Sequence, residues 1–250
     1  MAKLDGKVAV VTGASKGIGA SIALHLAAEG AAVVVNYASS KEGADRVVAE
    51  IAGKGGKAVA VQANVANQDD IRRLFAEAQK AFGRLDILVN NAGIYPLQAF
   101  EETSFELWRQ VMSVNVDGMF HMCQAFLPGM RERRYGRIVN ITTTVPWLSV
   151  PDFTAYAASK MAVIGLTRGL ASEYGEHGVT VNAAAPSLVR TATTESGPQA
   201  QMFEGVASMQ AIKRVQQPED MVGTIAFLAS DDAAFTTGQT LICDGGLVRV

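Results

Sequence analysis

The chain has 250 residues, of which 49% are hydrophobic and 18% charged, and its formal net charge is -2. A chain of this size and composition can bury a full hydrophobic core. Its nearly balanced charge gives no basis for binding nucleic acid or an anionic membrane surface. No apolar run approaches the roughly 20 residues of a membrane span. The first apolar run begins almost at the N-terminus, which leaves no room for a signal peptide and predicts a cytoplasmic location.

A glycine-rich turn follows that first apolar run. Residues 8–11 read VAVV, glycines stand at positions 13, 17 and 19, and residues 20–28 have helical composition. A strand, a tight turn and a helix in this order direct free backbone N–H groups and the positive end of a helix dipole at one point, which suits the pyrophosphate of a dinucleotide. The turn therefore predicts a dinucleotide site formed by Gly13, Ser15, Lys16, Gly17, Ile18 and Gly19.

Short apolar strands and longer helices alternate along the rest of the chain. This alternation predicts an α/β fold: one Rossmann-fold domain over residues 1–250, with a doubly wound, seven-stranded parallel sheet in the order 3-2-1-4-5-6-7 and helices on both faces. Ligands then bind at the carboxyl ends of the strands. The later strands are expected at residues 32–35, 58–62, 85–89, 137–141, 179–184 and 240–244, and helices at residues 68–82, 104–130, 154–174 and 218–228.

The polar stretch of residues 187–209 has weak periodicity and is too long for an ordinary connection between a strand and a helix. Long connections of this kind are usually lids or binding segments. We therefore expect a substrate lid at about residues 187–209.

The end of the second strand bears on the choice of dinucleotide. Sheets that bind NAD carry an acidic residue there, which accepts hydrogen bonds from the ribose and repels a 2′-phosphate. This chain has the uncharged Asn36, while Lys16 and Ser39 can contact a phosphate. These residues favour NADP(H) and leave NAD(H) possible, and Asn36→Asp is expected to shift the preference toward NADH.

Tyr156 and Lys160 are four residues apart in the predicted helix that begins near residue 154. This spacing places both side chains on one face, one turn apart. A phenol is too weak an acid to give up its proton at neutral pH, but a nearby ammonium favours the phenolate. The pair therefore predicts a tyrosine that acts as a general acid and base.

Five motifs together resemble the short-chain dehydrogenase/reductase family: TGASKGIG at 12–19, NNAG at 90–93, VNV around Asn115, YAASK at 156–160 and APSLVRT at 185–191. The resemblance covers the whole chain and implies hydride transfer between a nicotinamide cofactor and a ketone or secondary alcohol, with Tyr156 as acid and base. It implies that Lys160 lowers the pKa of Tyr156 and holds the nicotinamide ribose, and that Asn115 anchors a water. Thr143 stands where the family usually has Ser, and its hydroxyl can still bind the substrate oxygen.

Further cofactor contacts and the oligomeric state are expected from the resemblance alone. It implies a homotetramer. It also adds cofactor contacts from Asn64, Val65, Asn91, Ala92, Gly93, Pro186, Val189 and Thr191, beside those of Tyr156 and Lys160.

The substrate pocket is expected to be apolar, which suits an aryl or alkyl ketone or a keto ester. Several segments also resemble those of the phenylethanol-dehydrogenase-like members of the family. The residues expected to line the pocket are Tyr95, Val145, Trp147, Phe153, Leu188, Met202 and Phe203.

Two other functions stay open. The first is a 3-oxoacyl-acyl-carrier-protein reductase, whose acidic partner would dock on a cluster of arginines around the mouth of the site, although His177 stands where those reductases tend to carry a second Arg. The more distant one is a non-catalytic dinucleotide-binding protein. The three histidines have no metal-ligand spacing, so no metal site is expected. The arginine cluster on which the acidic partner would dock comprises Arg131, Arg133, Arg134 and Arg137.

Overall fold

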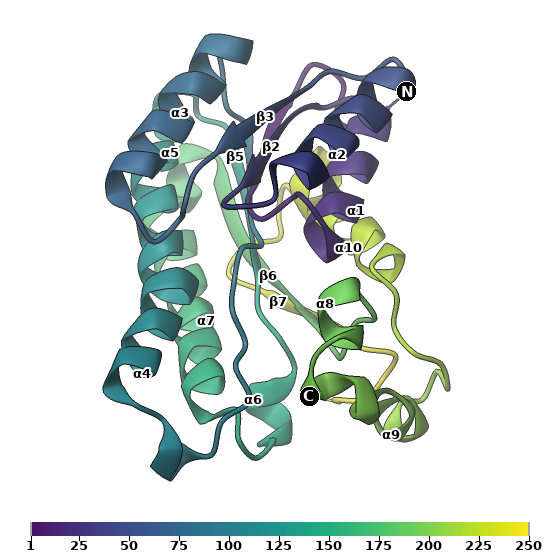
Figure 1. Ribbon diagram of the computed structural model, residues 1–250. Helices are drawn as coiled ribbons and strands as arrows, with labels where there is room; N and C mark the ends of the chain where they lie inside the picture. The colour runs from purple at the N-terminus through teal and green to yellow at the C-terminus, as the bar shows by residue number, and fades with distance from the viewer. Residues whose placement is uncertain (1, 250) are drawn as a thin grey trace.

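The computed structural model describes residues 2–249 and contains one parallel sheet of seven strands. The strand order is β3-β2-β1-β4-β5-β6-β7, as the sequence predicts, and every recorded pairing is parallel (Figure 1). The strands are β1 (Val8–Val11), β2 (Ala32–Tyr37), β3 (Ala58–Gln62), β4 (Ile87–Asn90), β5 (Gly136–Ile141), β6 (Val179–Pro186) and β7 (Thr240–Cys243).

Helices cover both faces of this sheet. α1, α2 and α10 pack together on one face, and α3, α5 and α7 form the layer on the other (Figure 1). The helices are α1 (Gly17–Ala28), α2 (Lys41–Gly53), α3 (Gln68–Phe82), α4 (Phe105–Met112), α5 (Gly118–Arg133), α6 (Val145–Leu148), α7 (Thr154–Tyr174), α8 (Ala192–Glu195), α9 (Phe203–Met209) and α10 (Glu219–Ala229).

The central strands are apolar on both sides because both faces of the sheet are covered. All four residues of β1 are buried, and Val10 lies opposite Val34 of β2 and Leu88 of β4. A strand buried on both faces appears in the sequence as a continuous run of β-branched residues rather than as an alternating one. This is why the VAVV run at the start of the chain predicts a central strand.

The helical tract expected over residues 104–130 is present from Phe105 to Arg133, but it is not one regular α-helix. The structure has α4, then a π-helical turn (η2, Ser113–Asp117), then α5, which continues to Arg133. Asn115 is the only buried residue of this turn. Its side chain bonds other segments of the chain, so the break is set by tertiary contacts that helical periodicity does not reveal.

The other differences concern element ends and connections. β4 begins at Ile87 rather than at residue 85. The preceding Asp86 is fully buried, and its side chain accepts a hydrogen bond from the Val8 N–H. The connection after β5 contains the short helix α6. The stretch of residues 187–209 contains α8, a 3₁₀ turn (η4, Pro198–Met202) and α9.

Residues 2–249 contain neither a membrane-spanning helix nor a cluster of metal-binding side chains. No helix in this part of the chain is long and apolar enough to cross a membrane. Nor do these residues contain a group of three or more His, Cys, Asp or Glu side chains that could hold a metal ion.

Candidate active site

A cavity of about 510 Å³ opens at the carboxyl ends of the strands. Its walls come from the turn after β1, the end of β2, the segment after β4, the segment after β5, the start of α7 and residues 186–206. This is the edge where a doubly wound sheet binds its ligands. Every residue predicted to contact the cofactor lines the cavity, and so do Thr143, Tyr156 and Lys160.

The glycine turn has the geometry of an anion site. Gly13 and Gly17 have φ angles of 62° and 54°, a region that favours glycine. A Cβ at Gly19 would collide with the carbonyl of Gly13. Lys16 caps α1 without any side-chain bond to the first turn, and no acidic residue lies in that turn. Because the first amides of the helix keep no side-chain acceptor, they suit the phosphates of a dinucleotide.

The segment after β4 is tied to the same turn. The Asn91 amide donates to the carbonyl of Thr12 at 2.8 Å, and the Thr12 hydroxyl accepts from the backbone N–H of Asn91 at 2.9 Å and of Ala92 at 3.0 Å. These bonds hold residues 91–93 beside the glycine turn. The two segments therefore form one continuous wall of the cavity.

Asn36 lines the cavity, but its side-chain amide is bonded within the protein rather than free to contact the cofactor. Its side chain is 1% exposed, accepts from the Gly13 N–H at 3.2 Å and donates to the carbonyls of Val61 and Ala63 at 3.3 and 3.1 Å. β2 also continues to Tyr37. Asn36 thus joins the glycine turn to β3, and an Asp there would place a carboxylate against two carbonyl oxygens. Cofactor preference is better sought in the next residues.

Ala38 and Ser39 are the first exposed residues after β2, and both line the cavity together with the partly buried Ser40. Lys16 is exposed on the same wall. A small side chain, two hydroxyls and a lysine can accommodate a phosphate on the adenosine ribose. Ser39 and Lys16 therefore lie where the sequence places them, whereas Ala38 was not singled out.

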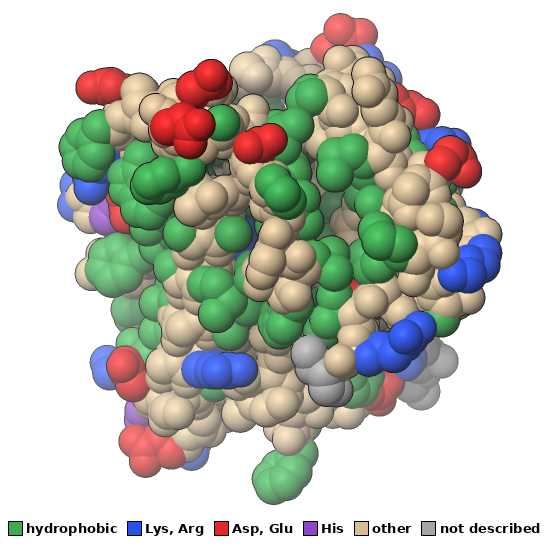
Figure 2. Space-filling model, turned by 90° about the horizontal axis from the view of Figure 1, so that it is seen from below, with side chains coloured by type: hydrophobic (Ala, Val, Ile, Leu, Met, Phe, Trp, Pro, Cys, Tyr) green, Lys and Arg blue, Asp and Glu red, His purple; other side chains and the backbone are tan. Residues whose placement is uncertain are grey.

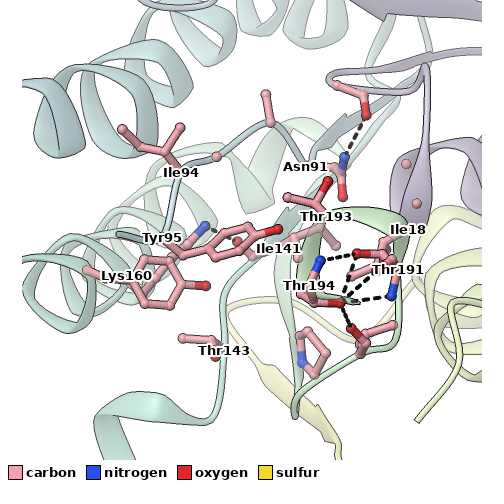
Figure 3. Close-up of a pocket in the computed structure, with 18 of the residues that line it drawn as sticks. Ile18, Asn91, Ile94, Tyr95, Ile141, Thr143, Lys160, Thr191, Thr193 and Thr194 are labelled. Atoms are coloured by element: carbon pink, nitrogen blue, oxygen red, sulfur yellow. Dashed lines mark hydrogen bonds between the residues drawn. The ribbon is translucent and has the colours of Figure 1, made fainter. Parts of the chain in front are cut away.

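Thr143, Tyr156 and Lys160 meet at the inner end of the cavity. Thr143 and Tyr156 both line this part of the cavity, and the Lys160 Nζ donates to the carbonyl of Ile141 at 2.8 Å (Figure 3). The same Nζ approaches the Tyr156 ring, at 5.8 Å from its centroid. One turn of α7 thus carries the tyrosine and the lysine side by side, and the end of β5 brings the threonine to them.

Burial changes the acidity of both groups on α7. The position of Tyr156 inside the cavity raises the pKa of its phenol, an effect that the Thr143 hydroxyl partly offsets. Burial lowers the pKa of Lys160 to about 8. At neutral pH the tyrosine therefore holds its proton and the lysine is largely charged. This combination suits a tyrosine that donates a proton.

Asn115 stands behind the wall of the cavity and does not line it. Its amide donates to the carbonyl of Ile94 at 2.9 Å and to the hydroxyl of Ser159 at 3.0 Å, and its Oδ1 accepts from the Ile94 N–H at 2.9 Å. Both amide hydrogens are used, so a water anchored by this residue has to donate to the second lone pair of Oδ1 or to the backbone carbonyl. The side chain itself fixes the loop after β4 against α7.

The outer half of the cavity is apolar. Of the seven residues predicted for the substrate pocket, Tyr95, Val145, Phe153, Leu188 and Met202 line it. Trp147 and Phe203 are not among the lining residues. Phe203 is buried beneath the guanidinium of Arg190, which lies 5.0 Å from the centre of its ring. Lining residues that the sequence analysis did not single out include Val114, Val150, Thr193, Thr194, Gln199, Val206 and Leu247.

Figure 2 views the molecule from the side of α6 and α9, where apolar side chains surround a hollow. Exposed apolar residues of these segments include Leu148, Met209 and Ile212. An apolar mouth disfavours sugars and small charged acids as substrates.

The arginine cluster expected around this mouth lies elsewhere in the protomer. Arg131 to Arg134 end α5 or directly follow it, before β5 starts, and therefore lie at the amino ends of the strands. Arg137 is 4% exposed and is bound to Asp231 at 2.9 Å. His177 precedes β6 at the same end. The expectation that these residues surround the cavity of their own protomer is wrong.

Comparisons with known proteins cover the whole fold. A family model described as enoyl-(acyl carrier protein) reductase matches residues 13–248. A 3-oxoacyl-[acyl-carrier-protein] reductase of Synechocystis sp. is 45% identical over 99% of both chains, and one of Staphylococcus aureus is 42% identical over 96% of this chain and 98% of its own. A solved structure from Agrobacterium tumefaciens, described provisionally as a gluconate dehydrogenase, superposes with a TM-score of 0.94 at 30% identity and covers 99% of this chain and 98% of its own.

Proposed function

Because the chain belongs to the short-chain dehydrogenase/reductase family, we propose that this oxidoreductase uses NADPH to reduce the keto group of a 3-oxoacyl thioester. The observation that carries the proposal is the meeting of Thr143, Tyr156 and Lys160 in a cavity that continues to the glycine turn. The names of the relatives from Synechocystis sp. and Staphylococcus aureus support the substrate class. This replaces the aryl ketone as the leading substrate.

The residues of the inner cavity account for the reaction. A reduced nicotinamide supplies the hydride to the carbonyl carbon when it is bound. The Thr143 hydroxyl donates to the carbonyl oxygen, and Tyr156 gives that oxygen its proton, which completes the alcohol. The charged Lys160 stabilises the phenolate left on Tyr156 until solvent returns a proton. Thr143, Tyr156 and Lys160 supply every side-chain group that this reaction needs. The alternative of a non-catalytic dinucleotide-binding protein therefore has no support.

A second substrate class is favoured by the aromatic walls. The rings of Tyr95 and Phe153 lie 6.1 and 5.8 Å from that of Tyr156, and both residues line the cavity. Aromatic rings beside the phenol of Tyr156 can pack against a flat aryl substituent of a substrate. A compact aryl or alkyl ketone is therefore the second candidate substrate. With either substrate, we still expect a homotetramer and a cytoplasmic location.

The substrate proposal is tested by following NADPH and NADH absorbance with acetoacetyl thioesters of coenzyme A and of a carrier protein, with a β-keto ester, and with acetophenone. We expect the kcat/KM of a thioester with NADPH to exceed that of acetophenone at least tenfold. A reversed ratio would assign the chain to compact ketones. If the protein binds the cofactor but no ketone lowers the absorbance of NADPH or NADH, both assignments are refuted.

Cofactor preference is expected to respond to Ala38. In Ala38→Asp the new carboxylate would face the site of a 2′-phosphate and repel it, as the acidic residue of NAD-binding sheets does. We expect the ratio of kcat/KM with NADPH to that with NADH to fall at least about tenfold, equivalent to about 1.4 kcal/mol. Ala38→Asn is the matched uncharged control and should leave the ratio within about threefold. An unchanged ratio in Ala38→Asp would show that the phosphate lies elsewhere.

The pH dependence of reduction follows from Lys160. Its pKa is lowered to about 8, so the lysine is charged below that pH and neutral above it. Tyr156 has a raised pKa and keeps its proton throughout this range. Reduction is therefore expected to slow as the pH rises through about 8, since the neutral lysine no longer stabilises the phenolate. A profile of kcat against pH that stays flat to about pH 10 would contradict this.

A further inference from the structure

Gln199 is a buried glutamine in the wall of the cavity. It belongs to the 3₁₀ turn η4 and lines the cavity together with Met202 of the same turn. The residue is only 5% exposed. A side-chain amide carries two donor hydrogens and an acceptor oxygen, and its burial costs free energy unless these groups find partners. A buried glutamine beside an apolar wall is therefore expected to have a partner.

The protein itself does not supply that partner. Within residues 2–249 the Gln199 amide has no hydrogen-bond partner, yet neither of its polar atoms is among the fully enclosed atoms that lack one. Oε1 of Gln210, in contrast, is both enclosed and without a partner. The amide atoms of Gln199 are therefore accessible, although the residue as a whole is buried. Because this residue lines the cavity, its accessible end faces the cavity.

Gly197 shows which end of the amide is available. A Cβ at Gly197 would lie 2.6 Å from Oε1 and 3.8 Å from Cδ of Gln199. The difference between these two distances is about the length of a C=O bond, so that bond points almost directly at Gly197. The amide nitrogen is consequently turned away from the glycine. Nε2, with its two hydrogens, is the group that can bind a ligand.

Neighbouring hydroxyls of the same segment already have partners. The Thr191 hydroxyl lies 3.1 Å from that of Thr194, which donates to the carbonyl of Val189 at 2.9 Å (Figure 3). The Ser187 hydroxyl accepts from the Leu188 N–H at 2.6 Å. These bonds hold the segment after β6 together without the amide of Gln199. Its donor hydrogens are therefore free for a bound molecule.

We propose that the Gln199 amide donates to the second carbonyl of the substrate, which a 3-oxoacyl thioester or ester has and a simple ketone lacks. This carbonyl is separated by one methylene from the keto group that Thr143 and Tyr156 bind. Gln199 is then a specificity-determining residue of the outer cavity. The inference rests on the proposed function in that the keto group is reduced at Thr143 and Tyr156.

Such a donor separates the two substrate classes considered above. A thioester carbonyl gives the buried amide the partner that the chain does not provide, whereas a simple ketone leaves the donor unpaired in an apolar wall. A site with a buried donor for a substrate oxygen disfavours analogues that lack this oxygen. Gln199 therefore favours 3-oxoacyl compounds over acetophenone.

The test uses two ligands that differ only in the second carbonyl: ethyl acetoacetate and 4-ethoxybutan-2-one, in which a methylene replaces it. Their dissociation constants from the complex of the protein with NADP are measured by ligand-observed NMR titration. Their kcat/KM values are measured with NADPH. We expect the parent chain to bind the ester at least about threefold more tightly than the ether, the range of one neutral hydrogen bond.

Two variants remove the donor in different ways. Gln199→Met replaces the amide at similar volume, and Gln199→Glu keeps the shape but has no donor hydrogen when ionised. Each should weaken binding of the ester and lower its kcat/KM about three- to tenfold, while the values for the ether stay within about twofold. Gln201→Met is the matched control, because Gln201 belongs to the same turn and is exposed. The dissociation constant of NADPH should stay within about twofold in all three variants, which shows that the cavity is intact.

The difference between the two ligands decides the matter. Equal losses for ester and ether in the Gln199 variants, unchanged values for the ester, or a parent chain that binds the ester no more tightly than the ether would overturn the proposal. The binding measurement requires no turnover. A parent chain that binds the ester through Gln199 but reduces no thioester would refute the proposed substrate and leave the role of Gln199 standing.

Discussion

Replacing Tyr156 with Phe is expected to lower kcat for ketone reduction by about 10²- to 10⁴-fold, the range that a positioned general acid contributes. The variant loses only the hydroxyl. The ring stays in place between Tyr95 and Phe153, and Lys160 keeps its bond to the carbonyl of Ile141. The dissociation constant of NADPH, measured by fluorescence titration, should change by less than about threefold.

The sign of this effect follows from the raised pKa of Tyr156. At neutral pH the phenol holds its proton and is ready to donate, so reduction needs no prior ionisation. Tyr174→Phe removes the same atom far from the cavity and should retain full activity. A Tyr156→Phe variant that keeps more than about a tenth of the parent kcat would assign the proton donor to another group.

The topology was predictable because it depends on composition over whole segments. Runs such as VAVV in β1 and ILV in β4 are apolar throughout, which in an alternating chain indicates a parallel sheet covered on both faces. The glycine turn indicated a dinucleotide-binding crossover after the first strand, and the predicted order extends the 3-2-1-4-5-6 order usual for such sheets. The site at the carboxyl ends followed from the same rules.

Asn36 shows where such reasoning stops. The sequence reveals a polar residue near the end of β2, but the strand extends two residues beyond its apolar run, to Tyr37. Asn36 therefore lies inside the strand and is paired with Val61 of β3, rather than at the start of the following loop. Only the register with β3 shows that it meets the carbonyls of Val61 and Ala63. Polarity alone could not distinguish a ligand contact from a structural one.

The arginine cluster is an error that the sequence could have prevented. Arg131 to Arg134 precede β5, and in a parallel sheet every residue just before a strand lies at the edge opposite the ligand site. The break at Asn115 is different in kind. It depends on contacts with Ile94 and Ser159, and no local pattern around residue 115 announces them.

Thr143 marks the departure of this chain from the usual serine, and Thr143→Val is expected to lower kcat/KM for reduction by about 10²- to 10³-fold. Valine matches the shape of threonine but cannot donate to the carbonyl oxygen. Thr143 accepts from the Val145 N–H at 3.4 Å, which leaves its own hydrogen free for Tyr156 or for a substrate. The loss should fall mainly on kcat, because the bond strengthens as charge develops on the oxygen.

The neighbouring hydroxyls cannot easily take over this role. The Thr142 hydroxyl donates to the carbonyl of Lys160, and the Thr144 hydroxyl donates to the carbonyl of Pro186, both at 3.3 Å. Thr143→Ser is therefore the informative control: it restores the family's usual residue, keeps the donor and relieves the χ1 restriction, so its rate should equal or exceed that of the parent chain. Steady-state kinetics with NADPH and the best substrate measure both variants. If Thr143→Val keeps more than about a third of the parent activity, the carbonyl oxygen binds a different donor.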